Sequence, residues 1–151
     1  MMLRRVELAC AACLLAAVVV LIAAASLARA LGTPIIWSIE IGQLLFLWLC
    51  IFAIDLALQD GRHFSLGILL DNVTPAVRRL IELVNIAVLI ALLGYLMQFA
   101  VRNTILMHPR LDGALQIPGS YFHASMVVGF ALMIRTLIAR LLIVLRQRAD
   151  A

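Results

Sequence analysis

Four long apolar stretches constrain the fold of this chain more than any other feature of its sequence. They cover residues 7–28, 36–58, 80–101 and 120–143. Each is close to the roughly 20 residues that a helix needs to cross a bilayer. Because 66% of the residues are hydrophobic and 13% are charged, an ordinary soluble domain is excluded. The sequence predicts an all-α integral membrane protein with four transmembrane helices in a single membrane domain, residues 1–151.

The arginines predict how the chain is oriented, because positive residues concentrate on the cytoplasmic side of membrane proteins. Only Arg29, Arg102 and Arg110 fall in or beside the first and third connections. The other basic residues lie toward the termini or in the second connection, so both termini are expected in the cytoplasm. Since the net charge of +4 is not gathered in one patch, nucleic-acid binding is not indicated.

The second connection is predicted to lie on the membrane surface rather than to form a simple polar loop. Residues 62–74 mix apolar side chains with a histidine and an aspartate, which is typical of an amphipathic interfacial segment. Thr74 followed by Pro75 predicts the start of the third helix. In the third connection, two dipeptides predict turns: Asp112-Gly113 and Pro118-Gly119.

The first stretch also has features of a signal peptide. Arg4 and Arg5 precede it, and residues 28–30 read Ala-Arg-Ala, a small-x-small pattern. Its apolar run is longer than the h-region of about 7–15 residues, which favours an uncleaved helix. Processing of the N-terminus stays open at this point.

The cysteines and histidines raise the alternative of a four-helix membrane redox enzyme. Cys10 and Cys13 have C-x-x-C spacing, but they lie in an apolar helix without neighbours that favour a thiolate. A haem between helices needs facing histidines at similar depth. His63 belongs to the inner side, whereas His108 and His123 belong to the outer side. Packing is therefore the preferred interpretation of the cysteines, and no catalytic residue, cofactor or metal is expected.

The second stretch carries an unusual polar face. At about 100° per residue, Trp37, Trp48 and Asp55 fall within roughly 20° of one another, and Glu40 lies about 60° away. Gln43 stands at the margin of the same face. Because charged groups inside a membrane face protein or water rather than lipid, protein is expected to cover this face.

The carboxylates of this stretch do not form an obvious ion site. Asp55 lies at a depth similar to that of Arg135, so we expect an ion pair between them. Glu40 lies near the opposite end of the helix, and no glycine or proline breaks a helix at mid-depth, as transporter sites often require. Substrate or ion binding by this chain alone is therefore not indicated.

Several motifs recur in a characteristic order along the chain. They are Trp37-x-x-Glu40, Phe46-x-Trp48, Gly61-Arg62-His63, Pro75-x-x-Arg78-Arg79, Ile117-Pro118 with Tyr121, and Gly129-Phe130-Ala131-Leu132. In this order the chain resembles the small transmembrane (Q-type) subunit of tripartite ATP-independent periplasmic (TRAP) transporters. It departs from the family pattern at Ile39, Gln43 and Gly67, lacks the proline usual after the tyrosine, and adds Asp55.

The resemblance implies a non-catalytic small permease subunit in the bacterial inner membrane. It would be a scaffold for a large multi-helix permease subunit that carries the substrate and sodium sites. A periplasmic solute-binding protein would deliver the substrate, usually an organic acid. The residues implied in the subunit interface are Trp37, Glu40, Gln43 and Trp48, and the cytoplasmic interface element is Gly61, Arg62 and His63.

Alternatives to this function remain at the level of sequence. They are the small subunit of a tripartite tricarboxylate transporter, a self-sufficient small exporter and the redox enzyme considered above. The sequence leaves open the transported solute and the oligomeric state. It also leaves open whether the helix carboxylates face a partner subunit or this chain's own helices.

Overall fold

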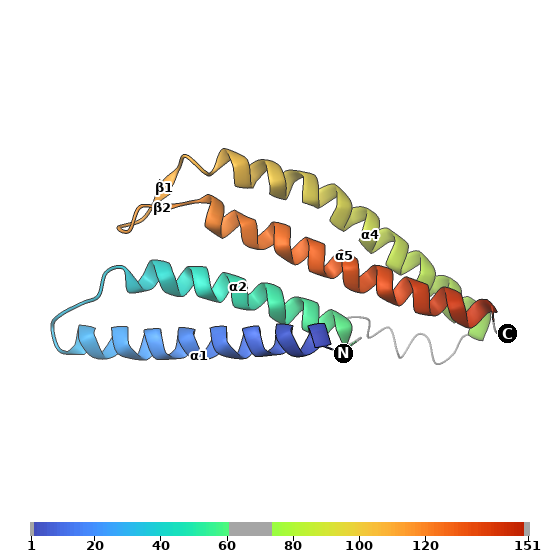
Figure 1. Cartoon of the computed structure of the whole chain (residues 1–151), viewed down its shortest axis with the longest axis horizontal. Coiled ribbons are helices and arrows are strands. Elements are labelled where there is room, and N and C mark those ends of the chain that lie inside the picture. Colours follow the sequence, from blue (N-terminus) through green and yellow to red (C-terminus); the bar gives the residue numbers. More distant parts are fainter. Residues whose placement is uncertain (1, 61–73, 150–151) are drawn as a thin grey trace.

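A computed structural model describes residues 2–60 and 74–149, which form long helices and one short β-hairpin (Figure 1). The helices are α1 (Met2–Ala30), α2 (Ser38–Gln59), α4 (Pro75–Leu106) and α5 (Ser120–Ala149). At 1.5 Å per residue, even the 22-residue α2 is about 33 Å long, enough to cross a hydrocarbon core of about 30 Å. All four have the length and hydropathy of membrane spans. The predicted all-α architecture with four transmembrane helices is therefore confirmed.

The start of α4 agrees with the capping signal in the sequence. Thr74 is the N-cap residue with an extended backbone (ψ 150°), and Pro75 is the first helical residue. Proline suits this position because its missing N–H would have no partner inside the helix. The Thr74 side chain makes no capping hydrogen bond. The amphipathic segment expected at 62–74 lies, apart from Thr74, outside the described residues.

The helices are arranged as two antiparallel hairpins that meet along α2 and α5. The pair α1 and α2 forms one hairpin, the pair α4 and α5 forms the other, and α2 packs on α5. The order across the molecule is thus α1, α2, α5, α4 (Figure 1). Both termini lie at one end, which we call the terminal end, and the β-hairpin lies at the other, which we call the hairpin end (Figure 1).

Small side chains bring α2 and α5 close together. A Cβ atom at Gly129 of α5 would approach the side chain of Ile51 on α2 to 2.7 Å, so only glycine allows the present spacing. One turn earlier, Ser125 is fully buried and donates its hydroxyl to the Phe122 carbonyl at 2.6 Å. This small-x-x-x-small spacing is common where membrane helices pack without a hydrophobic driving force.

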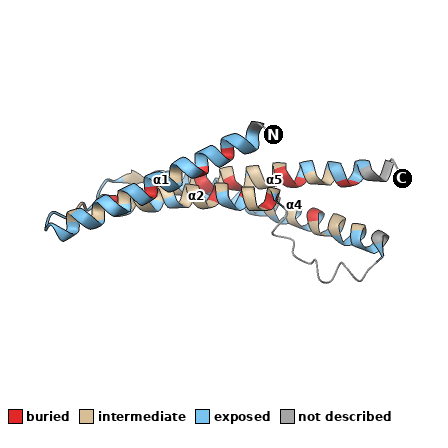
Figure 2. Ribbon diagram, turned by 90° about the horizontal axis from the view of Figure 1, so that it is seen from below, coloured by how far each residue is buried: buried red, intermediate tan, exposed pale blue. Residues whose placement is uncertain are grey.

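The apolar interior is narrow and is concentrated toward the terminal end. Leu58 of α2, Ile86 of α4 and Leu137 of α5 are buried together there, with Leu89, Ile90, Leu93, Met133 and Leu141 packed around them. Figure 2 shows that most of α1 and the outward surfaces of the other helices are exposed. Since these surfaces are apolar, they suit lipid or a membrane partner rather than water.

The β-hairpin closes the connection between α4 and α5. Strands β1 (Leu111–Asp112) and β2 (Ile117–Pro118) are antiparallel, with Asp112 opposite Ile117. Turns occupy residues 113–116 and Gly119, where the sequence predicted them. The Gly119 N–H donates to the Arg110 carbonyl at 2.8 Å, which ties the base of the hairpin together.

Candidate functional site

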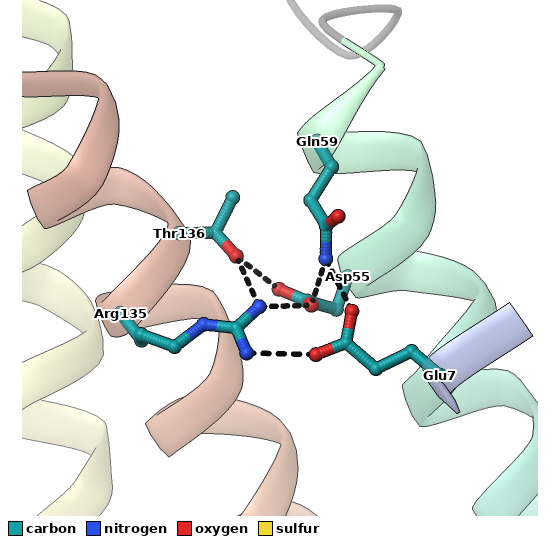
Figure 3. Close-up of polar contacts among 5 residues, drawn as sticks. All are labelled: Glu7, Asp55, Gln59, Arg135 and Thr136. Carbon is teal, nitrogen blue, oxygen red and sulfur yellow. Dashed lines mark hydrogen bonds and ion pairs between the residues drawn. The ribbon is translucent and has the colours of Figure 1, made fainter. Parts of the chain in front are cut away.

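A cluster of charged and polar side chains joins three helices within the apolar part of the molecule. Glu7 comes from α1, Asp55 and Gln59 lie one turn apart on α2, and Arg135 and Thr136 come from α5 (Figure 3). The guanidinium is central: Arg135 Nη1 lies 2.8 Å from Glu7 Oε1, and Nη2 lies 3.4 Å from Asp55 Oδ2. The cluster therefore joins α1, α2 and α5 by ion pairs.

Every carboxylate oxygen of this cluster accepts a hydrogen bond. Thr136 donates its hydroxyl to Asp55 Oδ1 at 2.8 Å, and Gln59 Nε2 donates to Asp55 Oδ2 at 2.8 Å. The same Gln59 amide nitrogen donates to Glu7 Oε2 at 2.5 Å. Among the described residues, no buried side-chain nitrogen or oxygen lacks a partner. The cost of burying polar groups is therefore offset by hydrogen bonds.

Burial makes these contacts energetically important. Asp55 is 0% exposed and Glu7 is 3% exposed. The Arg135 side chain is 37% exposed and lines an open cavity of about 650 Å³ toward the terminal end. Removing one partner of a buried ion pair typically costs about 3–5 kcal/mol, because the remaining charge is left uncompensated. The cluster is thus suited to fixing the relative positions of three helices.

Asp55 and Arg135 were predicted from the sequence to form an ion pair, whereas Glu7 was not predicted to join them. The structure brings Asp55 and Arg135 to 3.4 Å, and the shorter contact of the arginine is the one with Glu7. A signal was present in the sequence: Glu7 is the only acidic residue in the first apolar stretch. In an antiparallel pair, its place near the start of α1 puts it level with the end of α2, where Asp55 lies.

A second polar contact attaches the β-hairpin to α2 at the hairpin end. The Glu40 carboxylate accepts hydrogen bonds from the backbone N–H groups of Ala114 and Leu115, the latter at 3.0 Å. Gly113 has φ +77°, and a Cβ atom there would overlap the Glu40 carboxyl group. Glycine is therefore required both by the backbone conformation and by the close approach of the carboxylate.

The sequence of this chain matches a known family of membrane transport proteins over most of its length. The family model described as "Tripartite ATP-independent periplasmic transporters, DctQ component" matches residues 18–147. The chain belongs to the DctQ family. It is thus a small TRAP transporter component and a multi-pass protein of the inner membrane. A search of curated proteins gave no match.

The region that matches the DctQ family contains all but one of the charged residues that form the two polar contacts. Asp55, Arg135 and Glu40 lie inside the matched residues 18–147, whereas Glu7 precedes them. The main partner of Arg135 in this chain thus comes from the part of α1 that lies outside the matched region.

The residues that the DctQ resemblance implies in a subunit interface differ in how far they are exposed and in whether they have partners within this chain. Glu40 is hydrogen-bonded within the chain, and Trp48 is half-buried. Trp37, which precedes α2, is 45% exposed, and Gln43 is exposed beside α1. Both carboxylates of α2 thus have hydrogen-bond donors from this chain's own elements. The expected cytoplasmic element, Gly61-Arg62-His63, lies outside the described residues.

The cysteines and histidines do not form a cluster among the described residues. Cys10 and Cys13 are exposed on the apolar surface of α1, and Cys50 is partly buried. His108 Nδ1 lies 3.0 Å from the Ser120 hydroxyl in the hairpin region. In residues 2–60 and 74–149, no three histidine, cysteine or acidic side chains are arranged to hold a metal ion.

Proposed function

We propose that this DctQ component is the non-catalytic scaffold of a TRAP permease. Its partner would be a large multi-helix subunit that carries out sodium-coupled uptake of an organic acid, supplied by a periplasmic solute-binding protein. The family supports the role of small permease subunit.

The observation that carries the scaffold role is the internal pairing of the membrane charges. Glu7, Asp55 and Arg135 are bonded to one another, and their carboxylate oxygens are occupied by protein donors. A coupling-ion site needs oxygen ligands that are free to face the ion. The cluster instead has the connectivity expected of a fixed brace between helices.

The second polar contact supports the same role at the other end of the molecule. Glu40 holds the β-hairpin against the start of α2, so the connection between α4 and α5 is attached to the α1–α2 pair. Together with the three-helix cluster, this attachment restrains the two helix pairs at both ends. A rigid chain of this kind can support a partner that moves during transport.

We also propose that both termini are cytoplasmic and that the β-hairpin faces the periplasm. The arginine distribution predicts this orientation, and both termini lie at the same end of the molecule. In this orientation the β-hairpin is available to the solute-binding protein. The exposed Trp37 and the half-buried Trp48 are proposed contacts with the large subunit, and Gly61-Arg62-His63 is the proposed cytoplasmic contact.

Affinity purification of the tagged chain from native membranes in a mild detergent tests the proposal. We expect a large multi-span subunit in stoichiometric amount, identified by mass spectrometry. Trp37→Ala should lower its recovery, whereas the matched aromatic change Tyr121→Ala, also at an exposed position near the hairpin end, should not.

Two outcomes would contradict the scaffold role. Recovery of the chain alone, with transport activity in liposomes, would favour a self-sufficient exporter. A Soret band, or quinone-dependent oxidation of Cys10 and Cys13, would favour a redox enzyme.

A further inference from the structure

A groove between α1 and α2 near the hairpin end is not used by either polar contact. It has a volume of about 490 Å³ and is lined by Val18, Ile22, Ala25, Ser26 and Arg29 of α1 and by Ser38, Ile39, Gly42, Gln43 and Phe46 of α2. Small residues at its base, among them Gly42 and Ala25, lower the helix surface and create the depression. We propose that this groove binds one phospholipid of the adjacent leaflet, with its phosphate at Arg29.

The polarity of the lining changes along the groove. Arg29 lies at its mouth, near the end of α1, and Ser26 lies one turn further in. Further along the groove, away from Arg29, the lining residues Ile22, Val18 and Phe46 are apolar. A phospholipid has the same order: an anionic phosphate, then ester carbonyls, then an acyl chain. A transmembrane helix of a partner would not require this gradient.

Two of the polar side chains that line the groove, Arg29 and Gln43, have no protein partner within the described part of the chain. Their side chains are exposed and make neither a hydrogen bond nor an ion pair among the described residues, whereas the Ser38 hydroxyl donates to the Ile35 carbonyl at 2.6 Å. By contrast, Arg135, which lines the cavity toward the terminal end, is held by two carboxylates. An unpaired cation at the membrane interface is complementary to a lipid phosphate. The carboxamide of Gln43 can donate to an ester carbonyl.

The side chains of Arg29 and Gln43 lean toward each other along the groove, so both can contact one ligand. Gly42 lies beside Leu21, with 3.9 Å between a Cβ at Gly42 and Leu21 Cδ2, which sets the register of the two helices. Gln43 is thus about 13.5 Å further from the hairpin end than Arg29 along the helix axes. Because side chains lean toward the N-terminus of their own helix, Arg29 leans inward and Gln43 leans outward in this antiparallel pair. Both therefore approach the region between phosphate and esters.

Lipid titration of the purified full-length chain, followed by native mass spectrometry, tests this proposal without any partner subunit. We expect one phosphatidylglycerol to be retained more strongly than further lipids. Arg29→Gln should weaken that first binding step about fivefold, the factor expected for one arginine near an anionic headgroup. The matched control is Arg102→Gln, which removes another exposed arginine near the hairpin end but outside the groove. Equal binding by the two variants would overturn the proposal.

Two further variants separate the groove from a general effect of charge. Gly42→Leu places a side chain in the groove and should weaken phosphatidylglycerol and phosphatidylethanolamine alike, while circular dichroism checks that the helices are intact. Unchanged lipid binding by folded Gly42→Leu would contradict acyl-chain binding in the groove. In native membranes, Gln43→Cys should react with a thiol-reactive lipid probe when the native Cys10, Cys13 and Cys50 have been replaced by alanine, and the cysteine-free variant should not react. Crosslinking of Gln43→Cys to another protein would show that a partner, not a lipid, occupies the groove.

Discussion

Removing the central arginine of the three-helix cluster is the most informative perturbation of this fold. Arg135→Gln leaves the carboxylates of Glu7 and Asp55 buried without a cation. Because the Arg135 side chain is 37% exposed, solvent screens part of the effect. We therefore expect the lower end of the range for a broken buried ion pair, a loss of about 3 kcal/mol in the free energy of unfolding.

A double-mutant cycle then asks which carboxylate carries the interaction. Glu7→Gln alone should cost about 2 kcal/mol, the value of a hydrogen bond to a charged group. The double variant with Arg135→Gln should lose about 3 kcal/mol rather than 5 kcal/mol of unfolding free energy, because position 7 then holds no carboxylate to be left without its cation, and only Asp55 remains uncompensated. The coupling is thus about 2 kcal/mol. Asp55→Asn should show a weaker coupling, about 1 kcal/mol, since its 3.4 Å contact is longer than a good hydrogen bond.

The free energies can be measured by denaturant titration in micelles, with the fluorescence of Trp37 and Trp48 on or beside α2 as the signal. Arg110 and Asp112 provide a control pair, because they are 3.0 Å apart but largely exposed. Their coupling should stay below about 1 kcal/mol. Additivity of Glu7→Gln and Arg135→Gln within about 0.5 kcal/mol would refute the reasoning, as would equal coupling in the exposed pair.

Other parts of the structure lead to three further predictions. Gly113→Ala should destabilise the hairpin by about 1–3 kcal/mol and increase its cleavage by protease, because its φ is +77° and Glu40 fills the space of a Cβ. Gly129→Val should separate α2 from α5 and lower the melting temperature, and Ile51→Ala should partly restore it by making room for the new side chain. Arg4→Gln should change stability by less than about 1 kcal/mol, since its ion pair with an aspartate is exposed.

Each of these predictions has its own control. Gly32 also has a positive φ, but no side chain lies near the position of its Cβ. Gly32→Ala should therefore lower the free energy of unfolding less than Gly113→Ala. Equal protease sensitivity of the two variants would show that Glu40 is irrelevant to the hairpin. Failure of Ile51→Ala to improve Gly129→Val would argue against the close α2–α5 contact. If Arg4→Gln lowered the free energy of unfolding as much as Arg135→Gln, burial would not set the strength of these ion pairs.

The sequence by itself determined the class of fold, because the physics involved is local. Four apolar runs of about 20 residues must form helices in a bilayer, where every backbone polar group needs a partner within the segment. Thr74-Pro75 and Asp112-Gly113 mark a helix start and a turn through conformational preferences of the residues themselves. The similar depths of Asp55 and Arg135, with opposite charges, were also readable from position alone.

What covers each polar group was decided only by the tertiary structure. A helical wheel places Glu40 on the same side as Trp37, but its hydrogen-bond donors are the backbone N–H groups of residues 114 and 115, which have no sequence signature. Glu7 joins Arg135 because α1 packs antiparallel to α2, a pairing that hydropathy does not specify. The depth of a polar residue in the membrane can be counted along its own helix. Its bonding partner depends on which other helix or loop packs beside that helix in the folded chain.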